Sequence, residues 1–132
     1  MKIEDHYQQF RESMAVIDEC ISRGLQERQR NIGFNTSAAS ADLLEILLHK
    51  LNLIDPGFLV KHDWFNSQNK LKEKFAFDFP RKDEILKLIT KIEGKRNILC
   101  YGRPQDLQLL KEVINDFNKL KKIFREVGVD EF

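Results

Sequence analysis

Long stretches of this chain place apolar side chains at intervals of three and four residues, and this spacing constrains the fold more than any other feature. The clearest case spans residues 3–25, where successive apolar residues are 4, 3, 4, 3, 4 and 4 positions apart. Such spacing gives one apolar stripe along a helix. We therefore expect a long amphipathic first helix, with a stripe made of Ile3, Tyr7, Phe10, Met14, Ile17, Ile21 and Leu25.

Four further helices are predicted. The period breaks in RQRNIGFNTS, where Gly33 suits a helix exit, and residues 37–54 then form a helix that is apolar nearly all round. A short helix is expected within 66–75, and long helices over 82–100 and 105–127. Glycine and proline are scarce and no alternating strand pattern is present. The sequence thus predicts an all-α fold, an antiparallel bundle of four long helices plus a short one, in a single domain spanning residues 1–132.

Composition points to a globular intracellular protein. No run approaches the length of a membrane span, and the N-terminus, MKIEDHYQQF, lacks the apolar region of a signal peptide. Cys20 and Cys100 are far apart and flanked by apolar residues, so we expect buried free thiols in a reducing, cytoplasmic setting.

Motifs for metals, cofactors and covalent catalysis are absent. His6, His49 and His62 lie on three different segments, and no pair has metal spacing such as HxxxH. Glycine-rich phosphate loops, GxSxG and CxxC are also missing. The sequence therefore predicts no metal, no cofactor and no catalytic residue.

Basic residues gather in one part of the chain. Residues 58–103 carry 11 basic and 6 acidic side chains, although the net charge of the whole chain is +1. Lys87, Lys91 and Lys95 are four residues apart, so they line one side of a helix. A solvated helical face is the usual reason for such a surplus, and phosphate of RNA or a nucleotide is the alternative.

Arg96 is the most informative residue. Positions 85, 89, 92, 96 and 99 share one helix face, which places this charge on an apolar stripe. Burying a guanidinium costs several kcal/mol, roughly, unless it is paired. Three interpretations are open: Arg96 extends past the helix end and favours the helix dipole, it forms a structural ion pair, or it faces a cleft or dimer interface that holds phosphate.

The helix order and the segment KRNILCYG, residues 95–102, resemble the HEPN superfamily (higher eukaryote and prokaryote nucleotide-binding domains). These are small helical bundles, commonly dimeric. Many are metal-independent ribonucleases, and some are partners of minimal nucleotidyltransferases in toxin–antitoxin pairs. The HEPN motif is Arg, usually followed by Asn, Asp or His, and then a His that is separated from the Arg by four to six intervening residues. Arg96 and Asn97 match its beginning, but the positions for the His hold Tyr101, Gly102 and Arg103.

The missing His bears on activity, because an imidazole exchanges protons near neutral pH whereas a tyrosine hydroxyl is a poor base there. The resemblance thus implies a homodimer that binds RNA or a nucleotide, or a nucleotidyltransferase partner, without catalysis. The alternatives are a ribonuclease that uses Tyr101 or His62 in place of the missing His, and a structural helical adaptor. The expected phosphate-binding residues are Arg96, Asn97, Tyr101, Arg103, Lys95 and Lys91.

Overall fold

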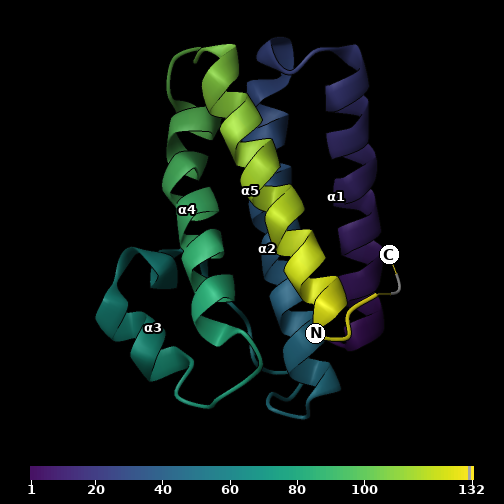
Figure 1. Ribbon diagram of the computed structural model, residues 1–132, viewed down its shortest axis with the longest axis vertical. Helices are drawn as coiled ribbons and strands as arrows, with labels where there is room; N and C mark the ends of the chain where they lie inside the picture. Colours follow the sequence, from purple (N-terminus) through teal and green to yellow (C-terminus); the bar gives the residue numbers. More distant parts are fainter. Residues whose placement is uncertain (131) are drawn as a thin grey trace.

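The computed structural model describes residues 1–130 and 132, and within them the chain forms five α-helices and no strands (Figure 1). Four are long and pack antiparallel, which confirms the predicted all-α bundle of four long helices plus a short one. The elements are α1 (Ile3–Arg23), α2 (Gln29–Lys50), α3 (Gln68–Lys74), α4 (Lys82–Tyr101) and α5 (Leu107–Glu126), with 3-10 helices η1 (Gln26–Arg28) and η2 (His62–Asn66).

α2 is the central helix of the bundle. It contacts α1, α4 and α5, and Figure 1 shows it behind α5, between α1 and α4. Five apolar side chains in its second half are at most 1% exposed, namely Leu43, Leu44, Ile46, Leu47 and Leu48. The prediction that this helix is buried on most sides is confirmed. The other helices of the same chain already cover this apolar surface. The surface is therefore no evidence for a dimer, and a prediction of dimerisation has to rest on a different part of the molecule.

The start of α2 differs from the prediction. The helix begins at Gln29 rather than at residue 37, so Gly33 lies inside it. A Cβ atom at Gly33 would lie 2.8 Å from both Sγ of Cys100 and Cβ of Leu99. The glycine is therefore needed for the close approach of α2 and α4, and not for a helix exit. This reason depends on tertiary packing, which the local sequence does not show.

The end of α2 also comes earlier than expected, at Lys50 instead of residue 54. Asn52 takes a left-handed conformation with φ 57°, and the amide of Leu53 donates to the carbonyl of Leu48 at 2.9 Å. Asparagine tolerates this conformation and closes helices much as glycine does. The chain has thus left the helix before it reaches Asp55, Pro56 and Gly57.

The other boundaries agree with the prediction to within two residues. Gly24, at φ 122°, follows α1, and its amide donates to the carbonyl of Cys20 at 3.0 Å. Asp106 caps α5 by accepting from the amide of Leu109 at 3.0 Å. The sequence did not predict η2. None of the helices within the described residues is long and apolar enough to cross a membrane.

Candidate functional site

A small hollow of about 190 Å³ lies between α4 and η2. Residues from the second half of α4 form one wall and residues of η2 form the other, so the hollow joins segments about thirty positions apart in the sequence. Its lining is entirely polar: His62, Asp63, Asn66, Glu93, Arg96 and Asn97. The structure thus brings the predicted pair Arg96 and Asn97 together with a histidine that was named only as an alternative.

Glu93 anchors one side of this hollow. Its carboxylate is buried, with a side chain 4% exposed, and Oε1 accepts from Oγ of Ser37 at 2.6 Å. The same oxygen lies 2.9 Å from Nδ1 of His62, whose side chain is 41% exposed. With the proton on Nδ1, the imidazole donates to Glu93 and Nε2 is left as its acceptor nitrogen. The carboxylate therefore orients the ring at the rim of the hollow.

Arg96 is half-buried, and its guanidinium lies over the ring of Phe34, 5.3 Å from the ring centroid. Among the residues that the structure describes, Arg96 has no ion-pair partner, so the structural ion pair considered above is not formed. A cation over an aromatic face keeps part of its stabilisation when water is removed. Of the three interpretations, a cleft position agrees with this geometry, since Arg96 also lines the hollow.

Phe34, the ring over which Arg96 lies, also forms an aromatic pair with Tyr101. The ring centroids are 5.8 Å apart and the planes are nearly perpendicular, at 89°. Tyr101 is 67% exposed, the most exposed of the large apolar and aromatic side chains in the described part of the chain. An exposed aromatic ring is a surface on which a nucleobase can stack.

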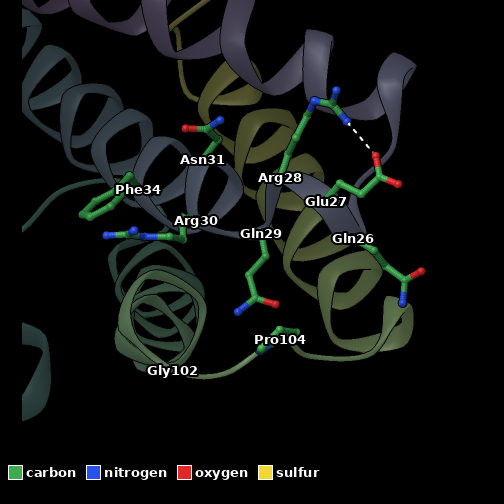
Figure 2. A pocket seen from close by; sticks show the side chains of 9 residues that line it. All are labelled: Gln26, Glu27, Arg28, Gln29, Arg30, Asn31, Phe34, Gly102 and Pro104. Atoms are coloured by element: carbon green, nitrogen blue, oxygen red, sulfur yellow. Dashed lines mark ion pairs between the residues drawn. The ribbon is translucent and has the colours of Figure 1, made fainter.

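A larger hollow of about 520 Å³, lined in part by Phe34, lies where α2 begins and α4 ends. Figure 2 shows Gln29 pointing toward the loop that carries Gly102 and Pro104. Its amide donates to the carbonyl of Arg103 at 3.1 Å and accepts from the amide of Gln105 at 2.7 Å. In the same view Arg28 turns away to pair with Glu27 at 3.5 Å. Gln29 therefore fixes the connection between α4 and α5.

The remaining predicted site residues lie elsewhere. Nζ of Lys95 faces α5, 3.7 Å from carboxylate oxygens of both Glu112 and Asp116. Lys91 lines a different groove, between α3 and α4. Arg103 is exposed in the loop after α4. The predicted basic ridge along α4 is therefore divided between two surfaces, and Arg96 and Asn97 are the only members of the predicted set in the hollow.

Sequence reasoning missed Glu93 and Ser37. A signal was present, because Glu93 lies three residues before Arg96 and next to Ile92, on the side of α4 that carries the apolar stripe. A carboxylate at such a position predicts a buried polar partner. The partners are Ser37 on α2 and His62 on η2, which are far from Glu93 in sequence, so only the fold identifies them.

Comparison with protein-family models, with curated proteins and with solved structures finds no match for this chain. The HEPN resemblance therefore stays a prediction, which rests on the helix order and on residues 95–102. We base the function on the geometry of the hollow and its surroundings.

Proposed function

We propose that the protein binds RNA or a nucleotide, with a phosphate group held at Arg96 and a base stacked on Tyr101. One observation carries this proposal: Arg96, which has no carboxylate partner among the described residues, lies over Phe34, and Phe34 also contacts the exposed ring of Tyr101. Guanidinium groups bind phosphate through two parallel hydrogen bonds, and aromatic rings bind bases of any sequence. The similarity to HEPN proteins at Arg96 and Asn97 supports the same function.

The charges around Arg96 favour an anion. Two carboxylates line the hollow, and both already have partners. Glu93 accepts from Ser37 and faces His62, while Asp63 lies 3.2 Å from Nζ of Lys70. Arg96 thus has no ion-pair partner among the described side chains, while both carboxylates of the hollow are held by other groups. The side-chain amide of Asn97 and the ring of His62 offer further hydrogen bonds to phosphate oxygens.

Fluorescence anisotropy with a labelled, short, unstructured RNA tests this proposal. We expect Arg96→Ala to weaken binding and to reduce the salt dependence by about one phosphate contact. Tyr101→Ala should cost about 1–3 kcal/mol of binding free energy through lost stacking, with little change in salt dependence. Arg11→Ala is the matched control, because Arg11 is exposed on α1. Equal losses for Arg11→Ala and Arg96→Ala would show non-specific attraction and contradict the proposal.

A second candidate function is cleavage of the bound RNA, and the contact between His62 and Glu93 favours it. A carboxylate that holds Nδ1–H leaves Nε2 able to take the proton of a 2′-hydroxyl. The 2′-oxygen would then attack phosphorus, the bond to the 5′-oxygen would break as that oxygen takes a proton from water, and Arg96 would stabilise the added charge on the phosphoryl oxygens. His62 would in this way supply the base that the positions after Arg96 lack.

Incubation of the purified protein with RNA in EDTA separates the two candidates. Cleavage that His62→Gln abolishes, with RNA binding retained, would support the catalytic role. Binding without cleavage would leave the protein as a binding module. Because His62 also ties η2 to α4, thermal unfolding of His62→Gln has to show an intact fold before its activity is compared.

A further inference from the structure

A second polar cluster lies between α1 and α2 and plays no part in the proposed function. His6 is 1% exposed, and one ring nitrogen faces each of two buried carboxylates. Nδ1 lies 2.8 Å from Oδ1 of Asp42, and Nε2 lies 3.3 Å from Oε2 of Glu45. One ligand atom from each of the three residues lies within 4.8 Å of the others. Burying such groups is destabilising unless hydrogen bonds, opposite charges or a bound ion compensate for the lost hydration.

The two contacts of His6 are not equivalent. The contact to Asp42 is a hydrogen bond, whereas Nε2 has no hydrogen-bond partner although Glu45 is near. For two ligands each about 2.1 Å from one ion, a separation of 3.3 Å gives an angle of about 104° at the ion, close to tetrahedral. Asp42 on the opposite nitrogen completes the carboxylate–histidine pair that usually supports a metal ligand.

His49 supplies the third position. Its Nε2 is buried without a hydrogen-bond partner, and its ring centroid lies 5.8 Å from that of His6. Two imidazoles bound to one tetrahedral ion have centroids roughly 5 Å apart, so the His49 ring would have to move toward His6 for its Nε2 to bind the same ion. Glu45 and His49 are four residues apart on α2 and share a helix face.

We propose that His6 Nε2, Glu45 Oε2 and His49 Nε2 bind one divalent transition-metal ion, with Asp42 orienting His6. Two imidazoles with one carboxylate favour zinc over magnesium or calcium, which prefer oxygen ligands alone. The spacing of the histidines along the chain predicted no metal, because a ligand set divided between α1 and α2 has no local spacing. The spacing Asp42–Glu45–His49, polar residues among the apolar side chains of residues 43–48, was the available signal.

The ion would join three parts of the fold. His6 comes from α1, and Glu45 and His49 come from α2. The other oxygen of Glu45 accepts from the amide of Val60 at 2.9 Å, which fixes the loop before η2 and leaves Oε2 facing His6. The amino group of Met1 contacts the carbonyl of Pro56 in the same loop. Metal binding should therefore stabilise the N-terminus of α1 and the loop together.

Titration of the chelator-treated protein with Zn²⁺, followed by calorimetry, tests the proposal. We expect one ion per chain and a melting temperature that rises with Zn²⁺ concentration. Co²⁺ in place of Zn²⁺ should give the intense visible absorption of a tetrahedral site. His49→Gln should weaken Zn²⁺ binding at least about tenfold, and Asp42→Asn about 10–100-fold through the orientation of His6.

His62→Gln is the matched control, since it removes a histidine that also faces a carboxylate but lies in the hollow between α4 and η2. It should leave Zn²⁺ binding unchanged. Loss of binding in His62→Gln with full binding in His49→Gln would overturn the proposal, and so would a wild-type protein that binds neither Zn²⁺ nor Co²⁺. Because His49 is only partly buried, His49→Gln keeps the test valid even where variants of the fully buried His6 do not fold.

Discussion

The guanidinium of Arg96 lies 5.3 Å from the centroid of the Phe34 ring, and this contact explains how a charge is accommodated beside the apolar stripe of α4. The ring face attracts the cation and replaces part of its water. No carboxylate is needed to hold the side chain in place. The charge is therefore available to an anion in the adjoining hollow.

This arrangement predicts that Arg96→Ala costs little stability. Loss of a partly exposed cation–π contact should lower the free energy of unfolding by about 0.5–1 kcal/mol. Breaking a buried ion pair would instead cost about 3–5 kcal/mol. Urea unfolding of the wild type, Arg96→Ala and the exposed control Arg11→Ala distinguishes these outcomes. A loss at the larger value would mean that Arg96 serves the scaffold and not a ligand.

Two helical glycines give an opposite pair of predictions. Gly33→Ala should destabilise the fold by about 1–3 kcal/mol, because the new Cβ would lie 2.8 Å from Leu99 and Cys100. Gly94→Ala should stabilise it by roughly 0.5–1 kcal/mol, since Gly94 lies within α4 with nothing within 4 Å of the new atom. Denaturant midpoints of both variants provide the measurement. Equal shifts would show that α2 and α4 do not approach each other at Gly33.

The number and order of the long helices follow from sequence periodicity because burial of a stripe requires only local spacing. Ile85, Ile89 and Leu99, for example, are all at most 1% exposed as the stripe on α4 predicts. The predicted boundaries of α2 were wrong for two different reasons. A glycine is needed at position 33 for the close approach of α4, and Asn52 takes a left-handed conformation that most asparagines do not.

The candidate site was predicted only in part. Arg96 and Asn97 are neighbours in sequence, so a short motif identifies them. The contact of Glu93 with His62 joins positions 31 residues apart, and its geometry depends on how η2 packs on α4. Likewise, His6 and Asp42 are 36 residues apart. Pairings of this kind come from tertiary structure, although charged residues on apolar helix faces mark one partner of each.

Dimerisation stays a prediction, now based on the exposed end of α4. Ile98 is 44% exposed and Tyr101 is 67% exposed, next to Arg96 and Asn97. Light scattering at micromolar concentration should give about twice the chain mass of 15.6 kDa. Ile98→Lys should shift the protein toward monomer, whereas Leu59→Lys, at a 54% exposed loop position, should not. A wild-type monomer across that range would remove a shared site between two copies.

The buried thiols predict a pH dependence of stability. Burial raises the pKa of Cys20 and also that of Cys100, where the charge of Arg96 opposes the rise. The folded state therefore keeps these protons more tightly than the unfolded state does. Their contribution to stability is complete below the unfolded thiol pKa of about 8.5 and is lost as the pH rises above that value.

Urea unfolding at neutral and at alkaline pH measures this effect. The midpoint of the wild type should fall between about pH 8 and pH 10, and the fall should be smaller in a Cys20→Ala, Cys100→Ala double variant. Comparison of the slopes removes the cost of the small cavities, which is the same at every pH.

A thiol reagent at pH 7 should react slowly with the folded protein and rapidly in urea, because the thiolate is the reactive form. Rapid reaction of the folded protein would show that at least one thiol is accessible, and a pH slope unchanged by the double variant would assign the effect to other groups.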